Sequence, residues 1–257
     1  MVSQRAKQSY GRPMRIMTYN VHGCVGVDRK LDVGRVAAVI AQCKPDVVAL
    51  QELDVGRARS GGVDQAHAIA SRLGMTFHFN SAMNVAEEKY GDAILTSLPM
   101  RLVRSGGLPK VARIRGLEPR GAVWVAIDAG DVELQVINTH LGLVPLEQRG
   151  QMACLLGRDW VGNPDCCSPA ILLGDFNATT RYAVYRSVTR NLRDAQRQLG
   201  ARRAIPTFPS RFPMLRIDHM FMTEGLRVVD VHAPAGPLAQ SASDHLPLVA
   251  DIELAAV

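Results

Sequence analysis

Short apolar segments with the pattern of β-strands recur along the whole chain, and they outnumber the segments with a helical pattern. Most are rich in β-branched residues, and residues 75–140 carry no helical pattern between their strands. The expected strands are residues 14–23 (with a turn at the end), 46–53, 75–83, 92–100, 101–107, 122–130, 132–140, 170–176, 215–222, 226–233 and 245–254. A doubly wound parallel sheet needs a helix after nearly every strand, so the pattern favours two packed sheets with helices on their outer faces.

Helices are indicated where apolar residues repeat at spacings of three and four. These segments are residues 32–43, 64–73, 146–156 and 185–199, of which the last predicts the longest helix. Asp32 can cap the start of the first helix and Pro45 ends it, while Gly74 is placed to end the second.

Composition places the chain among globular proteins. Its 257 residues are 47% hydrophobic and 21% charged, which predicts one domain over residues 1–257 with its core at about 14–254. No stretch approaches the roughly 20 apolar residues of a spanning helix, and residues 1–15 lack the apolar segment of a secretory signal. The five cysteines fit neither a disulfide scaffold nor a zinc motif, so we expect a cytoplasmic protein with reduced thiols, and a monomer.

The formal net charge of +6 favours an anionic partner, whether nucleic acid, a phosphorylated metabolite or an anionic membrane surface. Basic residues are dense in two groups: Arg181, Arg186, Arg190, Arg193, Arg197, Arg202 and Arg203, then Arg101, Arg104, Lys110, Arg113 and Arg115. Either group could follow a phosphate backbone, but for the first a solvated helix face is the simpler interpretation. Aromatic residues are only 5% of the chain, which leaves little surface for stacking single-stranded bases.

Polar side chains stand where expected strands end. They are Asn20, Glu52, His140, Asp175, Asn177, Asp218, Asp244 and His245. Each alone has a plain structural explanation, such as a turn cap for Asn20 or a core histidine for His140. Carboxylates seldom lie at a core edge unless paired or bound to a cation, however, and adjacent strands would bring these groups to one rim. Oxygen donors of this kind suit Mg²⁺, or Mn²⁺ as an alternative, better than zinc.

The motifs TYNVHG, LQEL, YGDAILTS, EPRGAVWV, NTHLG, LLGDFNA, RIDHMF and SDHLPL occur in this order from about Met14 to Leu254. As a set they closely resemble the endonuclease/exonuclease/phosphatase superfamily, which includes deoxyribonuclease I-like and exonuclease III-like nucleases, inositol polyphosphate 5-phosphatases and neutral sphingomyelinases. The chain looks most like the compact bacterial metal-dependent hydrolases. The resemblance implies a four-layer α/β sandwich of two mixed sheets, and Mg²⁺-assisted attack of water on a phosphoester.

The resemblance also implies roles for individual residues. Glu52 matches the metal ligand, supported by Asn20, and Asp244 matches an outer-sphere or second-metal carboxylate. The catalytic set is Asp175, which would orient and deprotonate water, the phosphate-contacting Asn177, His245 and His140, and Asp218 as the partner of His245. Weaker substrate-contact candidates are Tyr90, Asp92, Arg120, Phe208 and Phe212. Two residues depart from the family pattern, because many relatives have Asn at Asp92 and an aromatic residue at His219.

The sequence leaves three classes of function open. The favoured hypothesis is a phosphoesterase acting on a small molecule or a lipid headgroup, because residues 205–215 could form an apolar wall beside the site; plain core packing under this loop is an equal alternative. Any membrane contact would be peripheral, because the sequence shows no extra hydrophobic hairpin or anchor. The alternative is a DNA or RNA nuclease, which the basic charge would suit. A binding module without activity is disfavoured, since the set of chemical residues is complete.

Overall fold

Two six-stranded mixed sheets form the centre of the molecule in a computed structural model that describes residues 12–85, 88–111, 114, 116–200 and 204–254. In the first sheet the strands run β11 (Leu226–His232), β12 (Leu248–Leu254), β1 (Met14–Asn20), β2 (Val47–Val55), β4 (Glu88–Thr96) and β3 (Thr76–Val85). In the second they run β5 (Met100–Gly107), β6 (Gly121–Asp128), β7 (Glu133–His140), β8 (Ala170–Asp175), β10 (Asp218–Met222) and β9 (Arg193–Asp194).

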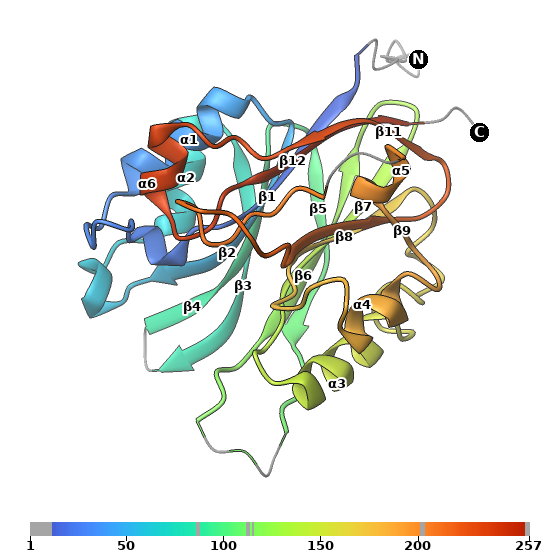
Figure 1. Cartoon of the computed structure of the whole chain (residues 1–257), viewed down its shortest axis with the longest axis horizontal. Coiled ribbons are helices and arrows are strands. Elements are labelled where there is room, and N and C mark those ends of the chain that lie inside the picture. The colour runs from blue at the N-terminus through green and yellow to red at the C-terminus, as the bar shows by residue number, and fades with distance from the viewer. Residues whose placement is uncertain (1–11, 86–87, 112–113, 115, 201–203, 255–257) are drawn as a thin grey trace, which may run out of the picture.

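Helices cover the outer faces of both sheets, so the four-layer α/β sandwich expected from the sequence is confirmed (Figure 1). The first sheet carries α1 (Val33–Cys43), α2 (Gln65–Leu73) and α6 (Pro237–Ala242), and the second carries α3 (Pro145–Leu155) and α4 (Ala183–Val188). Between the sheets lies an apolar core to which both contribute, including Ile16 and Val47 from one and Val125 and Ile171 from the other. The remaining short helices are η1 (His22–Cys24), η2 (Ala58–Ser60) and α5 (Ala195–Gln198).

Each sheet contains one pair of parallel strands near its centre. This arrangement determines where the polar residues at the strand ends lie. β1 runs parallel to β2, with Asn20 beside Gln51, and β7 runs parallel to β8, with His140 beside Asp175. The carboxyl ends of parallel strands meet at one edge of a sheet. The two central pairs therefore deliver their polar residues to the same rim of the sandwich.

A buried polar contact links the two sheets beneath this rim. Nε2 of Gln51 donates to Oδ1 of Asn138 at 2.7 Å and to Oγ1 of Thr18 at 3.0 Å. Nδ2 of Asn138 in turn donates to the backbone oxygens of Leu50 and Ala93, both at 2.9 Å. Buried amide N–H groups are costly without such partners, so this link favours one position of the sheets relative to each other.

Local signals predicted the helix ends well. Oδ1 of Asp32 accepts from the backbone N–H of Arg35 and caps α1, as expected. Gly74 ends α2 with φ of 65°, a left-handed conformation that glycine adopts without steric cost. Helix α6 was not predicted from the sequence, although Pro237 at its first turn is a common start signal. None of the helices in the described ranges is both long and apolar enough to cross a membrane.

The long helix expected over residues 185–199 is wrong. The chain instead forms α4, the two-residue strand β9 and α5. Tertiary contacts of Asp194 break the helix, because its carboxylate accepts from the Tyr185 hydroxyl at 2.5 Å and from Nη2 of Arg216 at 2.5 and 2.6 Å. Asp194 also caps α5 through the backbone N–H of Gln196, and it pairs with Phe221 of β10.

The first basic group therefore does not form one helix face. Arg193 lies in β9, where its guanidinium donates to the backbone oxygens of Thr223 and Leu226. Arg202 and Arg203, like Arg113 and Arg115 of the second group, lie outside the described residues.

The buried ion pair of Asp194 and Arg216, where the expected helix is interrupted, predicts that removal of its charge would strongly lower stability. Asp194→Asn should lower the free energy of unfolding by about 3–5 kcal/mol, because Arg216 stays buried without a countercharge. Urea denaturation at neutral pH measures the change. The control is Asp165→Asn at an exposed carboxylate, which should shift the free energy by less than about 0.5 kcal/mol. Equal effects of the two substitutions would contradict the assignment.

The same pair predicts a pH dependence. Burial opposes the charge on Asp194, but the hydrogen bond and charge of Arg216 outweigh it and lower the pKa of Asp194. Because the pKa of Asp194 is lower in the folded state than its unfolded value of about 3.9, the ionised carboxylate stabilises the fold at pH values above about 3.9. This stabilisation is lost as the pH falls from the unfolded pKa through the folded pKa. The difference in the free energy of unfolding between wild type and Asp194→Asn should therefore become smaller below about pH 4.

Candidate active site

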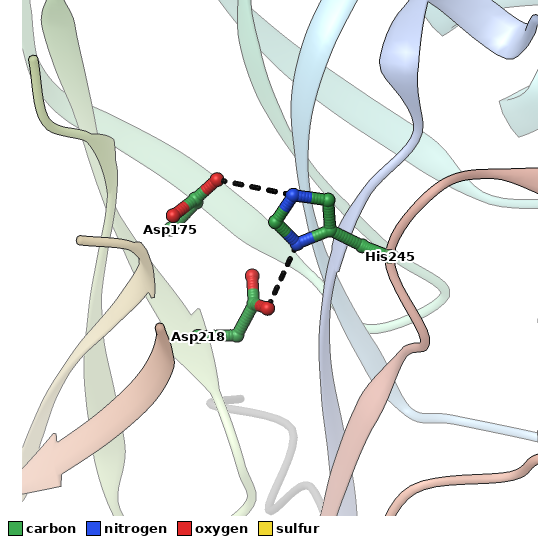
Figure 2. Close-up of side chains that lie close together, drawn as sticks. All are labelled: Asp175, Asp218 and His245. Atoms are coloured by element: carbon green, nitrogen blue, oxygen red, sulfur yellow. Dashed lines mark hydrogen bonds and ion pairs between the residues drawn. The ribbon is translucent and has the colours of Figure 1, made fainter. Parts of the chain in front are cut away.

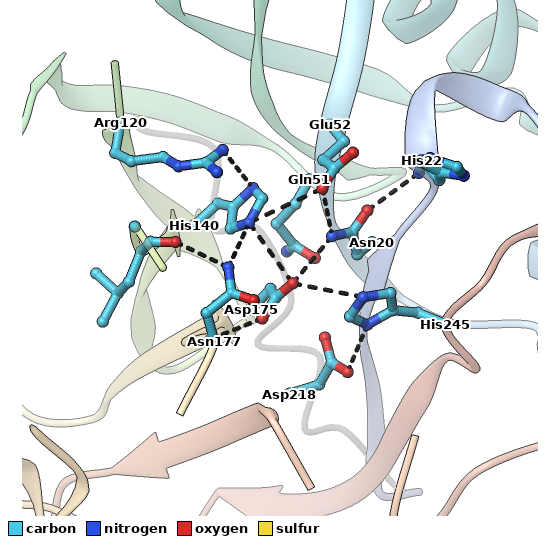
Figure 3. Close-up of polar contacts among 12 residues, drawn as sticks. Asn20, His22, Gln51, Glu52, Arg120, His140, Asp175, Asn177, Asp218 and His245 are labelled. Atoms are coloured by element: carbon cyan, nitrogen blue, oxygen red, sulfur yellow. Dashed lines mark hydrogen bonds and ion pairs between the residues drawn. The ribbon is translucent and has the colours of Figure 1, made fainter. Parts of the chain in front are cut away.

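The rim of the sandwich gathers the polar residues that the sequence placed at strand ends. Asn20, His140 and Asp175 are the last residues of β1, β7 and β8. Asp218 begins β10 directly opposite Asp175, and the loop before β12 carries Asp244 and His245. Figure 3 shows the side chains of Asn20, His140, Asp175, Asp218 and His245 converging from both sheets.

An extra residue in β2 aims Glu52 at this rim. Leu50 and Leu53 both pack in the cluster under the outer helices, and the pairing of β2 with β4 shifts register between them. Simple alternation would place Glu52 on the helix-covered face with Leu50, whereas the irregularity turns it aside with φ of 64°. A non-glycine residue at positive φ is strained, and such strain is concentrated at functional sites.

Asp175 lies at the centre of the contacts in Figure 3. Its Oδ1 accepts from the backbone N–H of Asn177 at 2.8 Å, and its Oδ2 accepts from Nδ2 of Asn20 at 2.9 Å. The same Asn20 nitrogen donates to Oε1 of Glu52 at 2.9 Å. Oδ2 of Asp175 also lies 3.6 Å from Nε2 of His140 and 3.6 Å from Nε2 of His245.

Burial sets the proton affinity of Asp175. Removal from water raises the pKa of this carboxyl to about 7, against the opposing effect of the nearby positive charge of His245. A carboxylate with a pKa near neutrality can both hold and release a proton at physiological pH.

His245 is held charged by a carboxylate behind it. Figure 2 shows the imidazole between Asp175 and Asp218, with Nδ1 donating to Oδ2 of Asp218 at 2.9 Å. That oxygen also accepts from the hydroxyl of Thr207 at 2.5 Å. Burial alone would lower the pKa of His245, but the charges of Asp218 and Asp175 outweigh it and raise the pKa to about 10.

His140 has the opposite protonation. Its Nδ1 lies 3.1 Å from Nη1 of Arg120, and because a guanidinium only donates, Nδ1 accepts and the ring proton is on Nε2. Burial, with the positive charges of Arg120 and His245, holds the pKa of His140 well below its usual value. Nδ2 of Asn177, which donates to the Leu141 oxygen, lies 3.0 Å from Nε2 of His140. Nδ2 of Asn177 and Nε2 of His140 both carry hydrogen, so they do not bond to each other. The two N–H groups could instead both donate to one oxygen atom of a ligand.

A cleft of about 480 Å³ opens at these residues. Its polar lining includes Glu52, Glu118, Arg120, His140, Asp175, Asn177, Asp244 and His245, and its apolar lining includes Leu143, Tyr182, Phe208, Leu215 and Ile217. Four carboxylates face only two cationic side chains, Arg120 and His245, since His140 is neutral. The side chains that line the cleft therefore carry an excess of negative charge.

The donors present fit a hard divalent ion such as Mg²⁺. Glu52 and Asp244 supply carboxylate oxygens to the cleft, and Asn20 holds Glu52 in place. Asp175, Asp218 and His245 also bring one potential ligand atom each within 4.8 Å of one another. Because His245 and Asp218 bond to each other, Glu52 is the better anchor for an ion.

The weaker substrate-contact candidates separate into two groups. Arg120 and Phe208 line the cleft, and the Phe208 ring centroid lies 4.9 Å from that of His245. Phe212 does not line the cleft and points to solvent. Tyr90 lines an adjoining hollow of about 380 Å³ that shares Glu52 and Glu118 with the cleft. Asp92 is buried beside Glu52, and burial raises its pKa to about 8 against the opposing charge of Arg120.

Several residues that hold the site were not identified from the sequence. Gln51 and Asn138 link the sheets, Thr207 bonds Asp218, and the hydroxyl of Ser243 donates to the Asn20 backbone oxygen at 2.8 Å. A polar residue inside an apolar strand was a usable signal for Gln51 and Asn138. Ser243 begins the SDHLPL motif, which gave it no role, and Thr207 lies in a loop where no local pattern marked it.

The sequence profile of the Endonuclease/Exonuclease/phosphatase family matches residues 17–245. The chain belongs to this family. Its members are phosphoesterases and nucleases, so the resemblance seen in the sequence is confirmed at this level.

Relatives in sequence and structure span almost the whole chain. The Escherichia coli (strain K12) protein YbhP is 24% identical over 251 residues, which cover 93% of this chain and 96% of YbhP. The endonuclease/exonuclease/phosphatase structure from Bacteroides vulgatus has a TM-score of 0.74 at 23% identity, covering 94% of this chain and 98% of its own. The Bacteroides thetaiotaomicron mannosyl-6-phosphatase Bt3783 has a TM-score of 0.74 at 20% identity, covering 93% and 99%.

The close packing of Gly174, directly before Asp175, predicts that a side chain at this position would destabilise the strands that carry the site. Its φ is 140°, and an added Cβ would lie 1.8 Å from the Thr139 backbone oxygen on β7. Gly174→Ala should therefore separate β7 from β8 and lower the free energy of unfolding by at least ~2 kcal/mol in urea denaturation. The control is Gly150→Ala in α3, where a Cβ meets nothing within 4 Å. That change should be neutral or stabilise by up to ~1 kcal/mol, and a stable Gly174→Ala would contradict the packing argument.

Proposed function

We propose that this protein is a Mg²⁺-dependent phosphoester hydrolase that activates water for attack on a phosphodiester or phosphomonoester. The observation that carries the proposal is Asp175, a buried carboxylate between one neutral and one charged imidazole in the cleft of Glu52. This arrangement offers a base, donors for a phosphoryl group and oxygen ligands for a cation within one cleft.

Glu52 would hold the ion, Asn20 would orient Glu52, and Asp244 would act as an outer-sphere or second-metal carboxylate. When bound, Mg²⁺ supplies positive charge that neutralises phosphoryl oxygens and polarises the phosphoester, and Mn²⁺ is the alternative ion. The excess of carboxylates in the cleft supports this assignment, because these groups would otherwise repel the substrate.

Asp175 would orient the attacking water and take its proton. Two N–H donors, from Asn20 and Asn177, fix the carboxylate, so its free direction is toward the cleft. A base with a pKa near 7 is well matched to proton transfer at neutral pH. Asp175 is thus both positioned and tuned for this role.

The two histidines and Asn177 would stabilise the phosphoryl group. Charged His245 presents Nε2–H, neutral His140 presents Nε2–H, and Asn177 presents its amide at the same cleft. Donors fixed before reaction stabilise the negative charge that develops on the non-bridging oxygens. Asp218 acts through His245, whose charge and orientation it maintains.

The shape of the cleft favours a small-molecule or lipid-headgroup substrate. Phe208, Leu215 and Leu143 give it an apolar wall, and the mannosyl-6-phosphatase named among the structural relatives supports a compact phosphorylated substrate. A nuclease is the second candidate, favoured by the charge of +6. A binding module without activity fits the complete set of catalytic groups less well.

We also propose that residues 1–257, with the core at about 14–254, act as one catalytic domain, since the apolar core between the sheets receives side chains from both. A cytoplasmic, monomeric protein remains a prediction from the sequence.

Asp175→Asn should lower the rate by about 10²–10⁴, because the amide keeps the shape but cannot take a proton. The assay is hydrolysis of bis-p-nitrophenyl phosphate, p-nitrophenyl phosphate, phospholipids and plasmid DNA, with Mg²⁺ or EDTA. Thermal unfolding should show an intact fold. An unchanged rate would falsify the base assignment, and plasmid nicking without hydrolysis of smaller esters would favour the nuclease.

Glu52→Gln should abolish most of the stabilisation by Mg²⁺, because it removes the anchoring charge while preserving an acceptor for Asn20. For the wild type, Mg²⁺ at about 100 times its Kd should add about 2.7 kcal/mol, seen as a rise in Tm. Glu118→Gln, at a carboxylate that lines the same cleft and pairs with Arg120, is the control and should keep the response. Equal responses of the two variants would refute Glu52 as the anchor.

A further inference from the structure

Large apolar side chains are exposed together around the mouth of the cleft. The four most exposed in the described ranges are Phe212 at 76%, Met214 at 75%, Leu143 at 71% and Leu146 at 59%. Leu143 lines the cleft, Leu146 stands three residues later in the first turn of α3, and Phe212 and Met214 belong to the loop whose residues Phe208 and Leu215 also line the cleft. Exposed apolar groups gathered at one place indicate an interaction surface.

The loop that presents Phe212 and Met214 is anchored at both ends. The backbone N–H groups of Met214 and Leu215 donate to the Phe208 oxygen, and Phe208 pairs with Leu215 in a β-bridge. At its centre the buried Ser210 hydroxyl donates to the backbone oxygen of Ser243 at 2.7 Å and lies 3.1 Å from that of Gln240. The exposed apolar tip is therefore a fixed feature of the fold.

The facing side is equally well anchored. The side-chain amide of Gln148 donates to the backbone oxygens of Gly142 and Asn177, each at 2.9 Å. This contact ties the start of α3, with Leu143 and Leu146, to a residue of the cleft itself. Tyr182 adds an exposed aromatic ring on the cleft lining.

A substrate confined to the cleft would leave most of this apolar surface in water. Phe212, Met214 and Leu146 do not line the cleft of about 480 Å³. Burying them requires a surface that extends across both sides of the cleft mouth. Aliphatic side chains dominate the set, and these insert among acyl chains but cannot stack on nucleobases.

Basic residues adjoin the apolar ones in the chain. Arg211 precedes Phe212, Arg181 precedes Tyr182, and both arginines are exposed. Lys110, also exposed, lies near enough to Glu147 of α3 to influence its charge. These three cations lie outside the cleft lining, where the carboxylates are in excess. Apolar groups with cations beside them complement the acyl boundary and anionic headgroups of a bilayer.

We propose that Phe212, Met214, Leu143 and Leu146 form a docking surface for an anionic lipid bilayer, and that the substrate is a phosphoester of a lipid headgroup. The substrate part of this proposal rests on the phosphoester hydrolase proposed above. Docking would place the mouth of the cleft against the headgroups, so a headgroup phosphate could enter without the lipid leaving the bilayer.

The test is co-sedimentation with vesicles of phosphatidylglycerol and phosphatidylcholine, or of phosphatidylcholine alone, in EDTA so that no turnover occurs. Wild type should bind the anionic vesicles more tightly. Met214→Asp combined with Leu146→Asp should weaken binding at least about tenfold, because both sides of the mouth lose an inserting group and gain a negative charge. Leu102→Asp, at an exposed leucine of β5 that does not line the cleft, is the control and should bind like wild type.

Absence of wild-type binding to either vesicle would overturn the docking surface, as would unchanged binding of the double variant with intact thermal unfolding. Dimerisation lost in the double variant, without vesicle binding by wild type, would assign the surface to a second copy instead.

Hydrolysis of bis-p-nitrophenyl phosphate distinguishes the docking surface from the proposed hydrolase function. The double variant should retain this soluble activity and lose at least about tenfold in rate only on vesicle substrate. Vesicle binding by a protein that hydrolyses no phosphoester would sink the proposed function but not the docking surface.

Discussion

One side-chain amide, that of Asn20, connects the two sheets at the rim. Its nitrogen donates to Glu52 on its own sheet and to Asp175 on the other, and its oxygen accepts from the backbone N–H of His22. The Asn20 backbone oxygen receives the Ser243 hydroxyl, which also accepts from the backbone N–H of His245. The spacing between the two carboxylates, and the position of the loop that carries His245, therefore depend on this residue. An Asp at this position would place a third negative charge where only a donor can hold two carboxylates together.

The two cleft histidines show how neighbours assign different chemistry to one residue type. Both are buried and lie 3.6 Å from the same oxygen of Asp175. Arg120 behind His140 excludes a second positive charge, whereas Asp218 behind His245 requires one. The cleft thus keeps one cationic and one neutral donor on either side of its central carboxylate, a division to which the charged residue behind each ring contributes together with burial.

The sequence predicted the layers of the fold and most of the rim residues, because strand periodicity and polar strand ends are local signals. It did not predict the direction of Glu52, which depends on a register shift against β4, nor the break at Asp194, which depends on Arg216 from a distant segment. Phe208 and Phe212 also looked equivalent in sequence, yet one lines the cleft and the other faces solvent. In each case a tertiary contact decided the outcome, and no pattern within a short window contains that contact.

The amide link between Gln51 and Asn138 has a consequence for ligand binding. Two sheets joined through such a contact cannot slide past one another without burying unsatisfied amides, so the donors on opposite sheets keep their separation before any ligand arrives. The side chains of the rim are positioned when the core between the sheets folds. These strands therefore lose no further conformational entropy when a ligand binds. Affinity in such a receptor is governed by desolvation and charge, and its empty and loaded forms should share the same β-scaffold.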